Sequence, residues 1–345
     1  MKIAVALSGG VDSTAAALVL IQQGHEVLGV TFRMHDAASD RLYYDAADSA
    51  RRLGVPHHII DIRERFAPDI MAPFCDEYLR GRTPNPCVVC NATVKFPALA
   101  AFAAEHGCGA CATGHYACLK TAPTGRRYVS TAADRKKDQS YFLFMLSQET
   151  MGNLVFPLCG ITKEQARALV AQEGIPCAEH EDSQEICFVP DQDYARFIET
   201  FTGLVPGPGD IVDAQGTKLG THRGIHRYTI GQRRGMGIAA PRPLYVTGID
   251  AALNRVIAGY REELDCAGLV AGRLTCMKET DLNGTSVLVK TRSTQEPFKA
   301  EVRVSEGRAT VTFMKPQMQI TPGQAAVFYN EEREILGGGI IEEVL

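Results

Sequence analysis

The first third of the chain alternates short apolar runs with amphipathic stretches, and this order restricts the possible folds. Apolar runs at residues 3–7, 27–32 and 57–62 are separated by amphipathic stretches at residues 14–23 and 45–53. The order strand, helix, strand, helix, strand implies parallel strands, because each helix carries the chain back to the same end of the sheet. We therefore predict the α/β class, a doubly wound parallel sheet with helices on both faces.

The chain is long enough for two or three domains, since one core rarely serves more than about 250 to 300 residues. Further helices are expected at residues 94–105 and 163–173, the second one capped by Thr162 and Gln165. Beyond Phe201 the helical periodicity gives way to Gly- and Pro-rich turns and short β-like runs. These runs lie at residues 244–249, 287–291, 299–304, 309–313 and 325–329.

From these changes we predict three domains, at residues 1–202, 203–264 and 265–345. The last should be a small β-barrel or sandwich.

The composition is that of a soluble globular protein, with 45% apolar and 22% charged residues. The longest apolar runs, residues 27–30 and 98–104, are too short to cross a bilayer, and no secretion signal follows Met1. We expect a cytoplasmic protein without a membrane span. The eleven cysteines, an odd number, favour reduced, metal-bound or catalytic thiols over a disulfide framework.

The charge distribution is uneven although the net charge is only −4. Residues 214–249 contain no Asp or Glu and six cations, an asymmetry typical of a phosphate-binding face or of a solvated loop. The six are Lys218, Arg223, Arg227, Arg233, Arg234 and Arg242. A second basic cluster comprises Arg126, Arg127, Arg135, Lys136 and Lys137.

A Gly-rich hexapeptide, residues 8–13, joins the first predicted strand to the first helix. Two glycines let the backbone fold around an anion, and the helix N-terminus directs free N–H groups at it. The pattern matches neither the Walker A nor the dinucleotide-binding signature. We interpret it as a phosphate cradle, with an ordinary strand-to-helix turn as the alternative. Substitution of Gly10 by a larger residue should keep the backbone from approaching the phosphate and should disfavour any positive φ.

Two further segments carry cysteines in suggestive positions. Residues 81–91 contain two prolines, which we interpret as forbidding a helix, and Cys87 and Cys90 form a C-x-x-C pair. Such a pair is redox-active, half of a zinc site, or a chance occurrence. Cys187 interrupts a short apolar run in an acidic neighbourhood, and by itself it would be a core cysteine.

Eight blocks, in order along nearly the whole chain, resemble the tRNA-specific 2-thiouridylases, which thiolate the wobble uridine of tRNA. The blocks are residues 8–13, 81–96, 112–116, 137–141, 182–188, 228–238, 321–324 and 336–341. The resemblance implies a PP-loop fold of the adenine nucleotide alpha hydrolase type for the first domain. It also implies a small central domain that contacts tRNA and a C-terminal β-barrel.

The resemblance further implies a two-step reaction at uridine 34. ATP, with Mg²⁺, adenylates the C2 oxygen, and a cysteine persulfide then delivers sulfur while AMP leaves. Cys187 would carry the persulfide, and Cys90 would be the thiol that activates it or closes a disulfide as the product leaves. Because a thiolate needs a nearby cation, we expect Lys or Arg from elsewhere at Cys187. The sulfur donor would be a cysteine desulfurase, a sulfur-relay protein or free sulfide.

The binding residues implied by the resemblance fall into two groups. The ATP contacts are Ala6, Leu7, Ser8, Gly9, Gly10, Val11, Asp12, Ser13, Phe32 and Gly114. The tRNA contacts are Asn85, Pro86, Cys87, His115, Lys137, Asp138, Gln139, Arg292 and Gln324.

Cys87 departs from the commonest family pattern, which has Asp at this position. Cys87, Cys90 and Cys187 together are potential ligands of an iron–sulfur cluster whose free iron binds sulfide, an alternative to the persulfide route. Two other hypotheses remain. One is a different PP-loop adenylating ligase, which has no need for Cys90 and Cys187. The other is a non-catalytic tRNA-binding or iron–sulfur protein, which has no use for residues 8–13.

Overall fold

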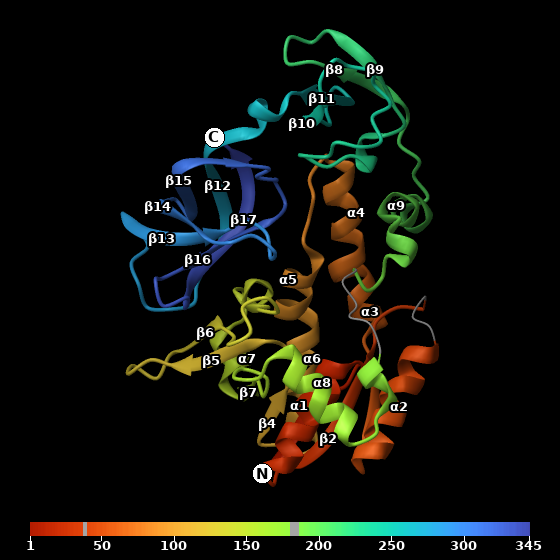
Figure 1. The fold of residues 1–345 in the computed structure, drawn as a ribbon, viewed down its shortest axis with the longest axis vertical. Coiled ribbons are helices and arrows are strands. Elements are labelled where there is room, and N and C mark those ends of the chain that lie inside the picture. Colours follow the sequence, from red (N-terminus) through yellow and green to blue (C-terminus); the bar gives the residue numbers. More distant parts are fainter. Residues whose placement is uncertain (37–39, 180–185) are drawn as a thin grey trace.

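The computed structural model describes residues 1–36, 40–179 and 186–345, and its fold has three regions (Figure 1). An α/β region contains the N-terminus, a small central sheet lies beyond helices α4 and α9, and a β-barrel holds the C-terminus. The exact domain boundaries stay predictions.

The α/β region is built on a five-stranded sheet in the order β3-β2-β1-β4-β7. Every neighbouring pair is parallel, which confirms the predicted fold class. The strands are β1 (Lys2–Ala6), β2 (Glu26–Arg33), β3 (His57–Asp61), β4 (Ala110–Ala112) and β7 (Leu154–Val155).

Helices cover both faces of this sheet, as the alternation predicts. On β1, Ile3 belongs to a buried cluster with Leu20 of helix α1, whereas Ala4 belongs to one with Leu99 of helix α6. Successive strand residues point to opposite faces, so α1 and α6 lie on opposite sides. The helices around the sheet are α1 (Val11–Gln22), α2 (Asp40–Leu53), α6 (Phe96–Glu105) and α8 (Lys163–Gln172).

Helix α8 packs against α1 and begins with the predicted capping box. The Thr162 side chain accepts from the Gln165 backbone, and the Gln165 side chain accepts from Thr162. The other elements of this region are short. They are α3 (Arg63–Phe66), η1 (Ala67–Met71), α4 (Ala72–Leu79), α7 (Gln148–Gly152), α9 (Tyr194–Thr202) and the hairpin of β5 (Ala117–Thr121) and β6 (Arg127–Thr131).

The prediction of a non-helical loop at residues 81–91 is wrong at its second half. Helix α5 (Pro86–Cys90), the π-turn η2 (Asn91–Lys95) and α6 follow one another without a break. Pro86 is the first helical residue, where its missing N–H is not needed. By length and composition alone the 20 residues Pro86–Glu105 would fit a membrane span, and 44% of the apolar window is buried inside the structure.

The central sheet has the order β10-β11-β8-β9. Helix α9 leads into it through Gly203, whose φ of 70° ends the helix in a left-handed turn. Its strands are β8 (Gly209–Val212), β9 (Lys218–His222), β10 (Tyr245–Asp250) and β11 (Arg255–Gly259).

The C-terminal region is a closed barrel in the order β12-β15-β14-β13-β16-β17, which decides between the predicted barrel and sandwich. Strands β12 and β17 were not among the predicted runs. In β17, residues Ile335 to Gly339 are all buried and show no alternation. The strands are β12 (Asp265–Cys276), β13 (Thr285–Lys290), β14 (Phe298–Ser305), β15 (Arg308–Met318), β16 (Ala325–Tyr329) and β17 (Ile335–Val344).

One pair of cysteines departs from the expectation of reduced or catalytic thiols. Cys118 of β5 and Cys159, 41 residues later, form a disulfide with their Cα atoms 4.7 Å apart. This pair could not be predicted from the sequence, because the two positions lie 41 residues apart and meet only in the folded chain.

The barrel and the α/β region are joined through the buried carboxylate of Glu334. It accepts hydrogen bonds from Lys120 at 3.0 Å and from Lys278 at 2.5 Å, and Tyr128 adds a third at 3.2 Å. Burial raises the pKa of Glu334, but bonds from Lys278, Asn330 and Lys120 outweigh it and lower the pKa to about 2. The joint therefore needs an ionised Glu334.

We predict that Glu334→Gln lowers the free energy of unfolding by about 1 to 3 kcal/mol at neutral pH, the usual range for losing hydrogen bonds to a charged group. Since the folded-state pKa lies below the ordinary 4.5, the loss should be complete well above pH 4.5. It should shrink as the pH falls through 4.5 toward 2. Urea titrations at several pH values measure it.

The matched control is Glu331→Gln, which removes the exposed Lys299–Glu331 pair of the same barrel and should cost less than about 1 kcal/mol. Equal losses in the two variants, or a loss that does not change with pH, would contradict this role of Glu334.

Candidate active site

The loop from Ser8 to Ser13 turns tightly between β1 and α1. The Ser13 hydroxyl donates to the Gly10 carbonyl at 3.0 Å and accepts from the Ser8 N–H at 3.1 Å. Thr14 also donates its hydroxyl to Gly10 at 3.0 Å. These internal bonds fix the loop, and Gly10 caps α1 without a side chain, so the first N–H groups of the helix stay available to an anion.

The position of this loop that requires a glycine is Gly9, and not Gly10 as predicted from the sequence. Gly9 has a φ of 76°, and a Cβ there would lie 2.7 Å from the backbone nitrogen of Ala46 in α2. Gly10 has a φ of −90°, and a Cβ there would meet only the Ser8 hydroxyl at 3.6 Å. The close packing of α2 therefore decides which glycine is required.

The carboxylate of Asp12 connects three segments. Its Oδ1 accepts from the Tyr116 hydroxyl at 2.8 Å and from the Lys163 ammonium at 2.7 Å. Gly114 passes so close that a Cβ would lie 2.6 Å from the Ser13 nitrogen and from the Asp12 carbonyl carbon. The loop after β4 and the start of α8 thus hold the phosphate cradle from two sides.

A cavity of about 230 Å³ opens at the cradle, at the carboxyl ends of β1, β2 and β4. Seven of the ten predicted ATP residues line it, namely Ala6, Leu7, Ser8, Asp12, Ser13, Phe32 and Gly114. Gly9, Gly10 and Val11 do not. Two predicted tRNA residues, His115 and Gln139, share the cavity, as do four residues without a predicted role: Thr31, Met34, Lys95 and Thr113.

His115 is a neutral group in this cavity. Burial, reinforced by the Lys95 ammonium, lowers its pKa to about 3. Its Nδ1 lies 2.8 Å from the Thr113 hydroxyl, and its ring packs between Phe96 and Phe156. Any contact it makes with a nucleotide is therefore a hydrogen bond or ring packing and not a charge interaction.

Lys95 is the cation that the sequence analysis expected near the cysteines. It interacts electrostatically with Cys90, Cys187 and Cys87. The π-turn η2 explains the contact with Cys90, since an i→i+5 turn brings residues five apart onto one face. Burial lowers the pKa of Lys95, but the three thiols raise it overall. The sequence shows a lysine five residues after Cys90, but only the π-turn reveals that the two side chains lie close together.

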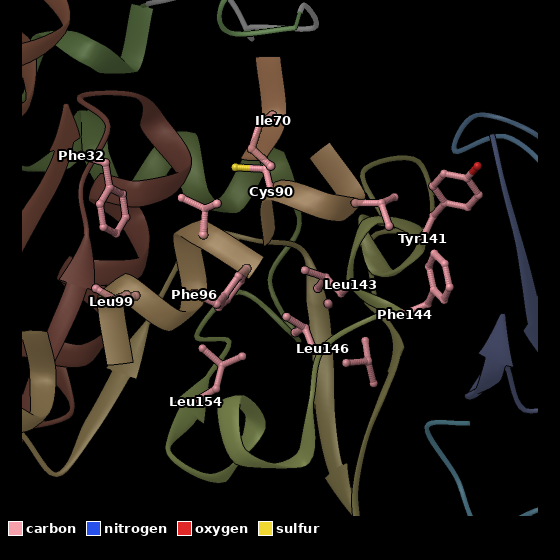
Figure 2. Close-up of a cluster of buried hydrophobic side chains, with 14 of the residues drawn as sticks. Phe32, Ile70, Cys90, Phe96, Leu99, Tyr141, Leu143, Phe144, Leu146 and Leu154 are labelled. Atoms are coloured by element: carbon pink, nitrogen blue, oxygen red, sulfur yellow. The ribbon is translucent and has the colours of Figure 1, made fainter. Parts of the chain in front are cut away.

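The three cysteines differ in exposure. Cys90 is buried at one side of the apolar cluster that includes Ile70 (Figure 2), Cys87 is half-buried, and Cys187 is exposed. Cys187 interacts electrostatically with Cys87, Cys90 and Lys95, so the structure brings it to the C-x-x-C helix, which the sequence alone could not show.

All three thiols are protonated at neutral pH. Burial raises the pKa of Cys90 and Cys87, and desolvation by surrounding protein raises that of Cys187 to about 12 although the residue is exposed. Lys95 opposes each of these shifts.

Phe188 anchors Cys187 beside the helix. Its buried ring packs against Phe66 at 5.7 Å and against Phe74 and Phe197 at 5.2 Å, joining α3, α4 and α9. His35, at the end of β2, hydrogen-bonds to the backbone of Cys187. Residues 182–185 of the predicted 182–188 block lie outside the described residues.

Several predicted tRNA residues have structural partners. The Gln324 amide donates to the Thr83 carbonyl at 2.9 Å, and the Arg292 guanidinium donates to Gln319 and Thr321 at 3.0 Å. The Asp138 carboxylate accepts from Ser140 at 2.8 Å. Asn85 and Pro86 line a second cavity of about 430 Å³ between α4 and the barrel. Whether these residues and Lys137 contact tRNA stays a prediction.

The two basic clusters separate into paired and unpaired cations. Arg227, Arg242 and Lys218 form ion pairs with Glu199, Glu262 and Asp210 from outside the acid-free window. Arg233 and Arg234 are exposed, with no ion pair among the residues that the structure describes. Arg126 and Arg127 donate to backbone carbonyls and so serve the fold.

Three family models match the chain in succession. They are the tRNA methyl transferase HUP domain over residues 1–191, the tRNA methyl transferase PRC-barrel domain over residues 196–260 and the aminomethyltransferase beta-barrel domain over residues 267–341.

Curated relatives match over the full chain. Two proteins named tRNA-specific 2-thiouridylase MnmA, from Geobacter metallireducens and Syntrophotalea carbinolica, are each 44% identical to it. The alignments cover 100% and 98% of this chain and 97% and 98% of those relatives. A solved 4-thiouridine synthetase–RNA complex with bound ATP matches 59% of this chain and 50% of that chain, at 17% identity and a TM-score of 0.37.

We predict that Gly9→Ala weakens ATP binding at least about tenfold and destabilises the fold, because a left-handed alanine costs roughly 1–2 kcal/mol before the overlap with α2 is added. Gly10→Ala is the matched control, since its backbone is extended and its Cβ has room. Equilibrium dialysis and thermal melting measure both effects. If Gly10→Ala lowers the melting temperature as much as Gly9→Ala, this assignment is wrong.

A second prediction concerns the reactivity of Cys187. With a pKa of about 12, its alkylation by iodoacetamide should rise about tenfold per pH unit from pH 7 to 10 without a plateau. Lys95→Met should react more slowly at every pH, because the cation that favours the thiolate is gone. Peptide mass spectrometry locates the label.

Lys218→Met, which removes an exposed lysine, is the control and should alkylate at the wild-type rate. A plateau below pH 9 would contradict the raised pKa of Cys187, and an unchanged rate in Lys95→Met would show that Lys95 does not act on this thiol.

Proposed function

The chain belongs to the tRNA-specific 2-thiouridylase family, and we propose from this that it uses ATP to replace the C2 oxygen of the wobble uridine of tRNA with sulfur. The observation that carries the proposal is the position of Lys95, which lines the phosphate cavity and also interacts with Cys87, Cys90 and Cys187. One buried cation thus connects a nucleotide site with a sulfur site, as a reaction with an activation step and a sulfur step requires.

In the activation step, the uridine C2 oxygen attacks the α-phosphorus of ATP and pyrophosphate leaves. Oxygen is a poor leaving group, and AMP is a good one, so this step makes the later substitution possible. The N-terminus of α1 and the cradle residues Ser8 and Ser13 would bind the phosphates, and Phe32 and Gly114 would line the nucleotide. The ten predicted ATP contacts and the nine predicted tRNA contacts are part of this proposal.

Mg²⁺ fits this site as a companion of ATP. In the residues that the structure describes, no group of three or more His, Cys, Asp or Glu side chains could hold a metal ion by itself. Mg²⁺ is commonly held by one or two carboxylates together with substrate phosphates, and Asp12 in the cavity wall would be that carboxylate. The bound ion would neutralise phosphate charge, while Lys163 and Tyr116 orient Asp12.

In the sulfur step, a persulfide on Cys187 would attack the activated C2, and AMP would leave with the former oxygen. The Cys90 thiolate would then attack the Cys187 sulfur, form a Cys90–Cys187 disulfide and release the 2-thiouridine. The sulfane sulfur gains two electrons, which the two cysteines lose, so a cellular thiol must reduce the disulfide before the next turnover. Lys95 would stabilise each thiolate as it forms. Cysteine desulfurases, relay proteins and free sulfide remain the proposed donors.

The iron–sulfur alternative does not fit the described structure. Cys87, Cys90 and Cys187 share Lys95 but do not form a group able to hold a metal ion, within the residues that the structure describes. We therefore derive no step through a cluster, and Cys87 is a third thiol in place of the usual Asp. The neutral His115, which lines the cavity, would then be the group that exchanges a proton with the base.

The experiment incubates the protein with tRNA, ATP and a sulfur source and measures 2-thiouridine by mass spectrometry of the nucleosides. We expect Cys187→Ser to abolish 2-thiouridine and to keep tRNA-dependent pyrophosphate release, because the cradle does not involve Cys187. The control Cys276→Ser changes an exposed cysteine of β12 and should thiolate normally.

Wild-type protein that forms no 2-thiouridine would overturn the function, and more than a few per cent of sulfur transfer in Cys187→Ser would overturn the persulfide role. Anaerobic preparations are assayed for iron and sulfide in parallel. Iron and sulfide that disappear together in Cys87→Ala would replace the persulfide route with the cluster route.

A further inference from the structure

A polar cavity of about 250 Å³ lies where the α/β region meets the barrel, separate from the cavity of the phosphate cradle. Its lining includes three cations, Arg135, Lys290 and Arg333, and two carboxylates, Asp138 and Glu296. Arg135 and Asp138 follow β6, and Lys290 ends β13 in the barrel. Asp138 is a predicted tRNA contact and Arg135 belongs to the second basic cluster, but Lys290 and Arg333 have no predicted role.

Lys290 is the unusual residue of this cavity. Only 8% of it is exposed, and it has no hydrogen bond or ion pair in the part of the chain that the structure describes. Burying an ammonium group without a partner costs free energy, because water solvates the charge far better than protein does. Burial accordingly lowers the pKa of Lys290. A counter-ion bound in the cavity would remove this cost.

The two carboxylates offset the charge of Lys290 only in part, because both act on it electrostatically and raise its pKa, yet burial outweighs them and lowers the pKa overall. Asp138 is directed to its own loop, accepting from the Ser140 hydroxyl at 2.8 Å and from the Ala132 N–H at 3.1 Å. Glu296 has a side chain that is 93% exposed, and its nearest cation is Arg333 at 3.9 Å. With three cations and two carboxylates, the lining of this polar cavity carries a net charge of one positive unit.

We propose that this cavity binds a phosphate group between Lys290, Arg135 and Arg333. Guanidinium groups hold phosphate oxygens in pairs, and a lysine adds a point charge, so this set suits a tetrahedral oxyanion. The volume accommodates a phosphate with part of the group that carries it. The phosphate is either a backbone phosphate of RNA or a free phosphate species, and the chemistry of recognition is the same for both.

The position of the cavity connects it with the active site. Asp138 lines this cavity and the next residue, Gln139, lines the cavity of the phosphate cradle. An RNA phosphate bound here would therefore lie in a cavity whose lining is adjacent in sequence to that of the phosphate cradle. The RNA source rests on the proposed function, whereas binding of free phosphate does not.

The test compares Lys290→Met with wild type in two titrations of the full-length protein. Isothermal calorimetry with inorganic phosphate and pyrophosphate reports free phosphate, and tRNA binding at several salt concentrations reports the backbone. We expect either a loss of phosphate affinity of at least about tenfold or a fall of about one in the slope of log affinity against log salt.

Arg135→Gln, at an exposed position, shows the same binding loss without a change in the core and decides the question if Lys290→Met does not fold. Lys299→Met, on the neighbouring strand β14 and outside the cavity, is the matched control and should bind as wild type. Unchanged phosphate binding and an unchanged tRNA salt slope in both cavity variants would overturn the proposal, even if tRNA thiolation itself is confirmed.

Discussion

The carboxylate of Asp12 is the interaction on which the active-site architecture depends. It is the meeting point of α1, the segment after β4 through Tyr116, and α8 through Lys163. Because a single oxygen accepts both bonds, movement of either partner moves the cradle. The close approach of Gly114 adds a steric constraint to these two hydrogen bonds. No side chain fits between the segment after β4 and the backbone of Asp12 and Ser13. Nucleotide binding is thus prepared by packing and not by a flexible Gly-rich loop.

Electrostatics then links the cradle with the thiols. Lys95 depresses the pKa of neutral His115 on one side and opposes the raised pKa of the cysteines on the other. A negative phosphate in the cavity would draw on the same ammonium that favours the thiolates. A bound phosphate and the thiolates would therefore compete for one positive charge.

Local patterns allowed the parallel sheet, the cradle and the Thr162 cap to be predicted, because each depends on neighbouring residues. The errors have long-range causes. Pro86 was interpreted as a helix breaker, although it only begins a helix, and the required glycine is Gly9 because α2 packs on it. Strand β17 is buried on both faces and lacks alternation. The role of Lys95 depends on a π-turn and on Cys187, 92 residues farther along the sequence, so the thiol site was predicted only through the family resemblance.

Residues of the barrel, distant in sequence, fix the segment that leads into helix α5. The Thr83 N–H donates to the Pro322 carbonyl, the Gln324 amide donates to the Thr83 carbonyl, and Arg82 donates to Ile341. The segment that leads into α5 is therefore fixed by residues that lie about 240 positions farther along the chain. During synthesis the parallel sheet can close early, yet the residues before Cys87 find their partners only after β16 and β17 have left the ribosome. A ribosome-bound fragment would therefore hold the cavity of the phosphate cradle before the segment that leads to Cys87 and Cys90 has its hydrogen-bond partners.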